Sequence, residues 1–206
     1  ISPILQENID EFYDLGYSGN IYKLYNYNMG IGEPNGAKDE KHSLATQNQL
    51  TYDFLSNPFV LAGKGVLECD KEYLLDKYGI DGKLDVLAGS IEDSGECELI
   101  ITDYFADCIK YYRDLTYQQI VDIPYIEMEL TRFKVKAIIN TNYKERYRDL
   151  LLDYAEVLEI ENIHDRKVEY EKLKNEKAFS DLYNELTTFL TIGFFIDGDF
   201  IERLFS

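Results

Sequence analysis

The pattern of apolar and polar positions divides the chain into expected strands and helices. Between Tyr125 and Leu130 the two kinds of residue alternate with a period of two, which is typical of a half-buried strand. Two later segments instead repeat apolar residues at helical spacing. The first of these sets contains Tyr147, Leu150, Leu151, Tyr154 and Leu158, and the second contains Phe179, Leu182, Tyr183, Leu186 and Leu190. The pattern therefore predicts strands in the middle of the chain and helices toward its end.

Glycine and proline mark further boundaries in the first two thirds of the chain. We expect a helix over residues 2–16 that ends at Gly16, and a tyrosine-rich strand over residues 20–28. A compact helix over residues 70–79 should end at Gly79. Further on we expect a strand near 83–88, a turn over 89–96, a strand near 97–102 and a helix from 105 to 121.

This order of elements predicts an α/β or α+β fold with a central mixed sheet over about residues 60–160. Helices should flank that sheet, and the C-terminal region should be helical. The division into residues 1–58, 59–160 and 161–206 describes regions of one structural unit. Residues 164–177 are polar on nearly every side, so they should form a solvent-facing helix or a linker.

Composition narrows the class of protein. Of 206 residues, 45% are hydrophobic, which is enough for a core, and no apolar run reaches the roughly 18 residues of a membrane span. No leader sequence is visible, and because the chain begins at Ile1 we expect a fragment or a processed product. Cys69, Cys97 and Cys108 form no CxxC pair, which favours reduced thiols in a cytoplasmic protein.

The net charge is the strongest fact of composition. The chain has 39 acidic and 21 basic residues and a net charge of −18. Nucleic acids and anionic membranes should repel such a protein, whereas a basic protein surface should attract it. We therefore expect no direct binding to nucleic acid and no membrane contact, and sequence leaves the oligomeric state open. The abundance of Tyr, Ile, Asn, Asp and Lys also fits a gene of low-GC bacteria or their phages.

One stretch, from Gly82 to Tyr112, contains a possible catalytic pattern. Its "GKLDVLAG", turn, "ELIITDY" and "FADCIKYYRDL" resemble the core of the PD-(D/E)XK nuclease superfamily, and the resemblance covers about Leu67 to Ile160. It implies that Asp85 and Asp103 hold Mg²⁺ or Mn²⁺, with Glu68 as an upstream acid. The lysine of the motif is replaced by Phe105, so Lys110 on the following helix or Lys136 on a later strand would have to supply its charge.

The same acids also have a structural interpretation. Asp85 would solvate the edge of a sheet, and Asp103 would cap the next helix through its free backbone amides. The window from Asp85 to Asp107 holds seven acids and no Lys or Arg. An acidic patch that binds a basic partner would then consist of Asp85, Glu92, Asp93, Glu96 and Glu98.

Two functions of different classes follow from these patterns. The first is a non-catalytic acidic interaction module, with no cofactor, that presents carboxylates and tyrosines to a basic protein. Such a module could be a phage or mobile-element protein that inhibits its partner or imitates nucleic acid, and its 18 tyrosines suit an interface. The alternative is a metal-dependent PD-(D/E)XK-type nuclease or an inactive relative. We expect Asp85 and Asp103 to lie close together on a hairpin in either case.

Overall fold

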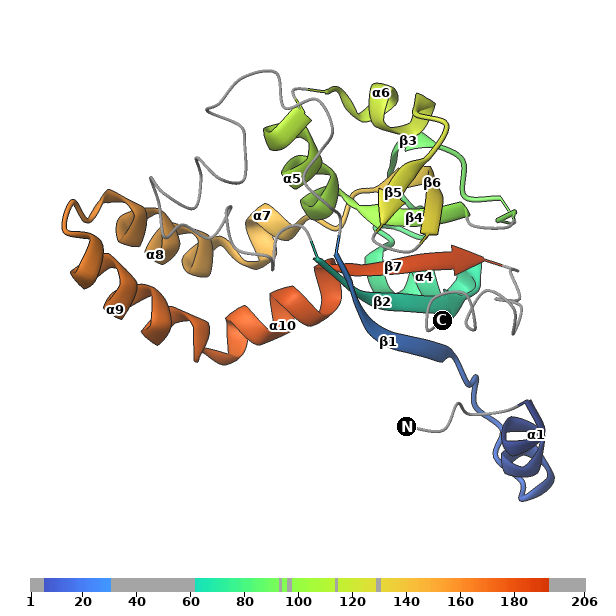
Figure 1. Cartoon of the computed structure of the whole chain (residues 1–206). Helices are drawn as coiled ribbons and strands as arrows, with labels where there is room; N and C mark the ends of the chain where they lie inside the picture. Colours follow the sequence, from blue (N-terminus) through green and yellow to red (C-terminus); the bar gives the residue numbers. More distant parts are fainter. Residues whose placement is uncertain are drawn as a thin grey trace.

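The computed structural model describes residues 6–30, 62–92, 94–95, 98–113, 115–128 and 131–192 of the chain. Over these ranges the chain forms a mixed β-sheet with helices on both faces (Figure 1). The strands are β1 (Lys23–Gly30), β2 (Ala62–Cys69), β3 (Val86–Gly89), β4 (Glu98–Thr102), β5 (Ile126–Met128), β6 (Thr131–Ile139) and β7 (Thr188–Ile192). The helices are α1 (Gln6–Asp14), α4 (Lys71–Tyr78), α5 (Asp103–Arg113), α6 (Tyr117–Asp122), α7 (Tyr143–Arg146), α8 (Arg148–Glu159), α9 (Ile163–Lys174) and α10 (Lys177–Leu186). Of the two predicted classes, α/β and α+β, the structure belongs to the α/β class, and the predicted mixed sheet with flanking helices is confirmed.

The order and direction of the strands determine which residues meet at each edge of the sheet. Within the described ranges the strands lie in the order β1-β2-β7-β4-β6-β3, and β5 pairs with the first residues of β6. Strand β2 runs parallel to β7, and β4 runs parallel to β6, but β7 and β4 are antiparallel. The carboxyl ends of β4 and β6 therefore meet at one edge of the sheet, and those of β2 and β7 meet at the opposite edge.

The expected hairpin of two neighbouring strands is not formed. Strands β3 and β4 lie close to their predicted ranges, but both pair with β6, which lies between them. The reason is that β6 is apolar on both faces: Ile138 belongs to the core on one side of the sheet and Ile139 to the core on the other. A strand buried on both faces occupies a central position in the sheet.

The C-terminal helix is shorter than its apolar spacing predicts. Helix α10 ends at Leu186, and residues Thr188–Ile192 form β7, which lies between β2 and β4. All five residues of this strand are buried, and its Thr and Ile residues favour an extended backbone. The sheet therefore includes two strands, β1 and β7, from outside the 60–160 range in which it was expected.

Several other predictions are confirmed closely. The helix expected over 2–16 is α1, which ends at Asp14, and residues 2–5 of that range lie outside the described residues. The helix expected to end at Gly79 is α4, whose C-cap is Gly79, and the tyrosine-rich strand is β1. One prediction in this part of the chain is wrong, because the single helix expected over 105–121 is two helices, α5 and α6. Helix α6 begins anew because Thr116 and Gln119 form a capping box, in which each side chain accepts a hydrogen bond from the other's backbone amide.

Both faces of the sheet are covered by apolar side chains. On one face Leu74 and Tyr78 of α4 pack against the sheet. On the other face the helices α5 and α6 cover a core in which the ring of Phe189 lies 4.9 Å from Phe105 and 5.2 Å from Phe133, measured between ring centroids. Within the described part of the chain, no helix combines the length and apolar character that a membrane crossing requires.

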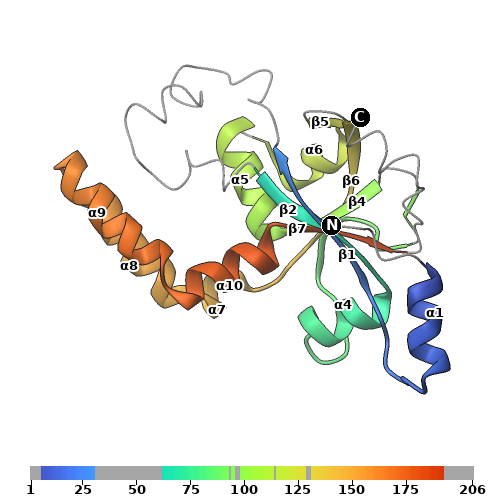
Figure 2. The same ribbon diagram turned by 60° about the horizontal axis from the view of Figure 1, so that its bottom comes forward.

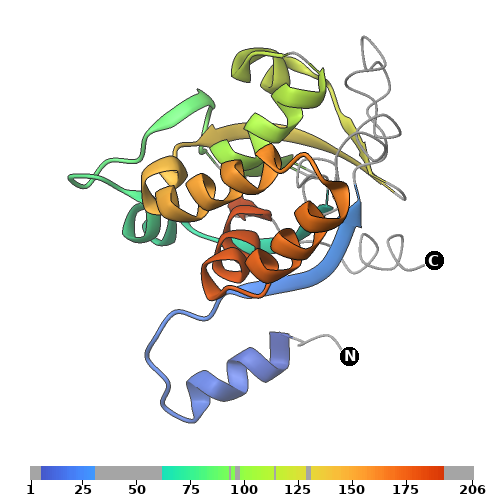
Figure 3. The same cartoon turned by 90° about the vertical axis from the view of Figure 1, so that its left-hand side faces the viewer.

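Helices α8, α9 and α10 form an arm that extends from the sheet and returns the chain to β7 (Figures 1, 2 and 3). The expectation that residues 164–177 lack an apolar side is wrong, because α9 buries Tyr170 and Leu173. The ring of Tyr170 lies 6.4 Å from both Tyr154 of α8 and Phe179 of α10, so it joins the three helices.

Candidate functional site

Polar side chains gather at the edge where β4 and β6 end. We call this group the polar edge: Asp85, Asp103, Asn140 and Thr141. Asp103 follows β4, Asn140 and Thr141 follow β6, and Asp85 precedes the antiparallel β3. In open α/β sheets ligands commonly bind beyond the carboxyl ends of parallel strands. The polar edge is therefore the first place to look for a site.

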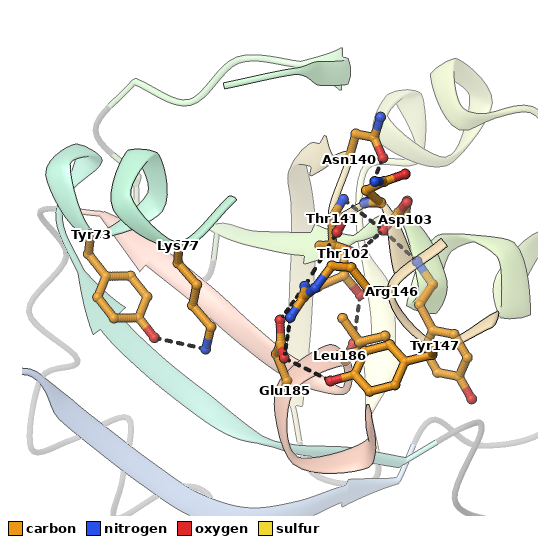
Figure 4. Close-up of polar contacts among 12 residues, drawn as sticks. Tyr73, Lys77, Thr102, Asp103, Asn140, Thr141, Arg146, Tyr147, Glu185 and Leu186 are labelled. Carbon is orange, nitrogen blue, oxygen red and sulfur yellow. Dashed lines mark hydrogen bonds and ion pairs between the residues drawn. The ribbon is translucent and has the colours of Figure 1, made fainter. Parts of the chain in front are cut away.

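Asp103 is buried in the polar edge, with 6% of its surface exposed. Its Oδ1 accepts hydrogen bonds from the backbone N–H of Thr141 at 3.1 Å, the hydroxyl of Thr141 at 2.6 Å and the backbone N–H of Tyr104 at 3.1 Å (Figure 4). Burial raises the pKa of Asp103 above its usual value, and the bonds from Thr141 oppose that rise. The carboxylate is thus already engaged by its own chain.

The expected helix-capping role belongs mainly to the residue before Asp103. The hydroxyl of Thr102 accepts a hydrogen bond from the backbone N–H of Phe105 at 3.2 Å and donates one to the carbonyl of Leu186 at 2.6 Å. Thr102 therefore both caps α5 and ties it to the end of α10, whereas Asp103 is the first residue of the helix.

Asp85 lies at the same edge but is exposed. Its Oδ2 accepts a hydrogen bond from the side-chain amide of Asn140 at 2.8 Å, and its carbonyl accepts one from the Asn140 backbone N–H at 2.9 Å. Asp85 and Asp103 therefore contact two consecutive residues, Asn140 and Thr141. The structure brings these two acids to one edge of the sheet, with β6 between them instead of a shared hairpin.

A second cluster surrounds Asp107, one helical turn after Asp103. Its two carboxylate oxygens accept hydrogen bonds from the hydroxyls of Tyr117 at 2.6 Å and Tyr143 at 2.7 Å. Lys110 and Lys144 lie 3.9 and 3.4 Å from the same carboxylate. Burial, followed by the Asp107 carboxylate, raises the pKa of both tyrosines.

Lys110, the candidate catalytic lysine, belongs to this second cluster. Its Nζ also lies 4.4 Å from the ring centroid of Tyr117. Lys110 is seven residues after Asp103 on the same helix, and a rise of about 1.5 Å per residue places their Cα atoms roughly 10 Å apart. Lys110 is therefore held beside Asp107 and Tyr117 instead of between Asp85 and Asp103.

Glu68 does not join the polar edge either. It lies near the carboxyl end of β2, at the opposite edge of the sheet, in register with Lys23 of β1 and Thr191 of β7. Across the ranges that the structure describes, no three His, Cys, Asp or Glu side chains form a group that could hold a metal ion.

Two described members of the proposed acidic patch, Asp85 and Glu98, lie at opposite edges of the sheet. Glu98 pairs with Lys134 at the start of β6, whereas Asp85 contacts Asn140 just after its end. At about 3.3 Å per residue these positions are roughly 20 Å apart. The exposed Glu92 lies in the β3–β4 connection, and Asp93 and Glu96 lie outside the described residues. Asp85 and Glu98 therefore do not belong to one patch.

Glu98 also forms contacts within the chain. It accepts a hydrogen bond from the backbone N–H of Gly95 at 2.7 Å and forms an ion pair with Lys136 at 3.4 Å. The Gly95 amide, followed by Lys136, lowers the pKa of Glu98 below its usual value.

Arg146 and Glu185 fix the polar edge to α10. The two guanidinium nitrogens of Arg146 donate to the two carboxylate oxygens of Glu185 at 2.7 and 2.9 Å, and the Tyr147 hydroxyl donates to Glu185 at 3.0 Å (Figure 4). Arg146 also donates to the carbonyl of Thr141 at 3.3 Å. Sequence offered no signal for this pair, because its members are 39 residues apart.

Helix α8 carries a row of acids that the sequence interpretation did not single out. We call it the α8 acidic stripe: Asp149, Asp153, Glu156 and Glu159, all exposed. Residues three or four positions apart lie on the same side of a helix. The stripe is therefore continuous, and it lies opposite the buried Leu150 and Tyr154. This spacing was visible in the sequence.

Comparison of the chain with known protein families, curated proteins and solved structures finds no match. The fold and the site together define an α/β protein with a mixed sheet, an internally bonded polar edge and an exposed acidic arm. Function must therefore be inferred from these features alone.

Proposed function

We propose that this protein is a non-catalytic acidic interaction module that binds a basic protein surface. The α8 acidic stripe is the observation that carries the proposal. None of its four carboxylates forms an ion pair or side-chain hydrogen bond among the described residues. Three acids of the neighbouring helices are paired, namely Glu169 with Lys172, Glu171 with Lys174 and Asp181 with Lys177.

The stripe is unfavourable for the free protein. Asp149 and Asp153 are four residues apart, and Asp153, Glu156 and Glu159 follow at intervals of three. Each like-charged pair at such spacing destabilises a helix by about 0.2–0.5 kcal/mol. The last turn of α8 also contains no basic residue, so its acids face the negative end of the helix dipole. A basic partner would remove both penalties.

Leu152 gives the stripe an apolar centre. It is 53% exposed and lies between Asp149, Asp153 and Glu156 on the same side of α8. An apolar anchor surrounded by charged residues is a common arrangement at protein interfaces. Because carboxylates repeated along a rod resemble the phosphates of a nucleic-acid strand, a nucleic-acid-binding protein is a fitting partner. Cys69 and Cys108 are free and buried, which supports a cytoplasmic setting.

Calorimetric titration with poly-L-lysine at several salt concentrations tests this proposal. Replacing the stripe acids by Asp149→Asn, Asp153→Asn and Glu156→Gln should weaken binding about tenfold, because each exposed ion pair contributes about 0.2–1 kcal/mol. The matched control is Glu169→Gln, Glu171→Gln and Asp181→Asn, which removes the same charge from paired acids. Equal loss of affinity in both variants would show that net charge alone, and not the stripe, governs binding.

The metal-dependent nuclease is the second candidate function, and the presence of Asp85 and Asp103 at one edge favours it. Under this alternative, Mg²⁺ or Mn²⁺ would lie near Asn140 and Thr141, between the two acids. Incubation with DNA and RNA in either metal, for the wild type and for Asp85→Ala, tests it. Our proposal predicts no cleavage by either protein, and cleavage that Asp85→Ala abolishes would replace the interaction module by the enzyme.

A further inference from the structure

Two of the buried oxygen atoms that lack a hydrogen-bond partner within the described ranges lie on adjacent strands. They are Oε2 of Glu68, near the end of β2, and Oγ1 of Thr191, near the end of β7. Glu68 and Thr191 are in register on these two strands, which run side by side and parallel (Figure 1). Buried polar atoms in native proteins are nearly always bonded, so such a pair is typical of a site that binds an ion or a water molecule.

The two side chains share one face of the sheet. Val66 and Phe189, which precede them on the two strands, are also in register, and both belong to the core that α5 and α6 cover. Because side chains alternate along a strand, Glu68 and Thr191 lie on that same face. Neighbouring strands are about 4.8 Å apart, and a cation the size of Na⁺ or Ca²⁺ lies about 2.3–2.6 Å from its oxygen ligands. One ion can therefore contact both side chains.

The surroundings of this pair supply no bond to either oxygen. Next to Thr191 on β4 lies the buried Leu99, whose side chain has no polar atom. On the other side Lys23 of β1 is in register with Glu68, but its ammonium group does not bond to Oε2. Thr191 has 0% of its surface exposed, whereas Glu68 is half-buried. The pair thus combines an inner hydroxyl with a carboxylate that solvent reaches, at the carboxyl ends of parallel strands, where ligands commonly bind.

The charge of this pair favours a monovalent cation as the ligand. A water molecule could bond to both oxygens, but it would leave the charge of the carboxylate uncompensated. A divalent ion would exceed the charge of a single carboxylate, and no group of three His, Cys, Asp or Glu side chains suited to a metal occurs in the described part of the chain. The net charge of −18 also concentrates cations around the protein.

We propose that Glu68 and Thr191 bind Na⁺ or K⁺, and that this ion links β2 to β7. Oε2 of Glu68 supplies the negative charge, Oγ1 of Thr191 supplies a neutral ligand, and water completes the coordination from the exposed side. Strand β7 begins directly after α10, so the ion stabilises the strand through which the helical arm joins the sheet. The site is separate from the α8 acidic stripe and does not depend on the proposed function.

Thermal melting of the full chain in NaCl, KCl and choline chloride at equal ionic strength tests this proposal, because choline is too large to lie between the two oxygens. At a salt concentration several times the Kd, the wild type should melt about 2–4 °C higher in NaCl or KCl than in choline chloride. Thr191→Val replaces the hydroxyl by a methyl group without changing the charge, so this variant should lose the difference. In choline chloride it should melt no lower than the wild type, because an unpartnered hydroxyl contributes no bond.

Thr188→Val is the matched control in the same strand, because the Thr188 hydroxyl donates to the carbonyl of Asn184 at 2.6 Å. It should melt lower than the wild type in all three salts and keep the difference between them, whereas Glu68→Gln should lose that difference. Equal melting of the wild type in the three salts would show that the oxygens bind water at most. A difference that Thr191→Val and Glu68→Gln retain would show general screening of surface charge. A lower melting temperature of Thr191→Val in choline chloride would show that its hydroxyl bonds within the chain; each of these results overturns the proposal.

Discussion

Asp103 illustrates how one buried carboxyl group organises its surroundings. Its Oδ1 satisfies two backbone amides and one hydroxyl, on Tyr104 and Thr141. Asp103→Asn keeps an oxygen that can accept these bonds, whereas Asp103→Ala leaves three donors without a partner. We expect Asp103→Ala to lower the free energy of unfolding by about 1–3 kcal/mol, measured by urea denaturation at pH 7. A cost as small for Ala as for Asn would show that these bonds contribute little.

The pKa of Asp103 gives a prediction with a definite sign. Because burial raises this pKa in the folded state above the usual 3.8, the ionised form opposes folding. The penalty is absent at pH values below 3.8, appears as the pH rises through the raised pKa, and is complete above it. The unfolding free energy of Asp103→Asn relative to wild type should therefore increase between about pH 4 and pH 7. A decrease over that range would contradict the burial of the charge.

Gly89 is required at the end of β3, where the backbone of β3 lies close to that of β6. Its φ of +79° is unfavourable for other residues, and an added Cβ would lie 2.0 Å from the backbone oxygen of Lys136. Gly89→Ala should therefore destabilise the protein by about 2 kcal/mol or more, as measured by thermal unfolding. Gly82→Ala is the informative control, because Gly82 also has a positive φ but its Cβ would meet no atom within 4 Å.

Among the secondary-structure elements, α9 shows what a sequence pattern omits. Only Tyr170 and Leu173 are buried along this polar helix, yet they connect α8 to α10. We expect Leu173→Ala to cost about 2–5 kcal/mol, because it leaves a cavity between the helices. Val168→Ala, at an exposed position of the same helix, should change stability by less than about 0.5 kcal/mol. Similar effects of the two substitutions in urea denaturation would mean that the arm is loosely packed.

Neutralising charges of the α8 acidic stripe should stabilise the folded protein. Neutralising Asp153 and Glu156 removes all three like-charged pairs of the stripe and one acid near the C-terminus, for a gain of about 1 kcal/mol, and it keeps Asp149 in the first turn, where an acid is favourable. That gain corresponds to a rise in Tm of about 2–4 °C for a chain of this size. The paired acids Glu169, Glu171 and Asp181 should give no rise when they are neutralised. An unchanged or lower Tm for the stripe variant would show that repulsion between these carboxylates does not destabilise α8.

At the scale of the whole molecule, local patterns predicted the elements better than their arrangement. Helices α1, α4 and α8 and strands β1 and β5 follow from periodicity and from their end residues, because those signals are local. The position of β6 between β3 and β4 depends on the burial of both faces of β6. That burial results from packing between segments that are far apart in the sequence, so a local pattern does not record it. The central strand β7 was missed because helical spacing continued to Leu190 while burial favoured a strand.

For the candidate site, the sequence likewise predicted some of the residues but not the contacts between them. The sequence predicted that Asp85 and Asp103 would lie close together on a hairpin. The structure places both at the polar edge, but β6 lies between the strands that carry them. Two of the three hydrogen bonds to Asp103 come from Thr141, 38 residues away, and no local sequence pattern predicts them. The α8 acidic stripe could have been found from its spacing, but its lack of ion pairs among the described residues required the structure.

Hydrogen–deuterium exchange of the full chain, with and without poly-L-lysine, tests the central claim most directly. Binding to the α8 acidic stripe should slow backbone exchange in residues 148–159, because a bound partner relieves the repulsion that favours opening of this helix. The paired acids of α9 and the polar edge around Asp85 should exchange as in the free protein. Protection centred on Asp85 and Asn140, with none in α8, would contradict the account and move the binding surface to the polar edge.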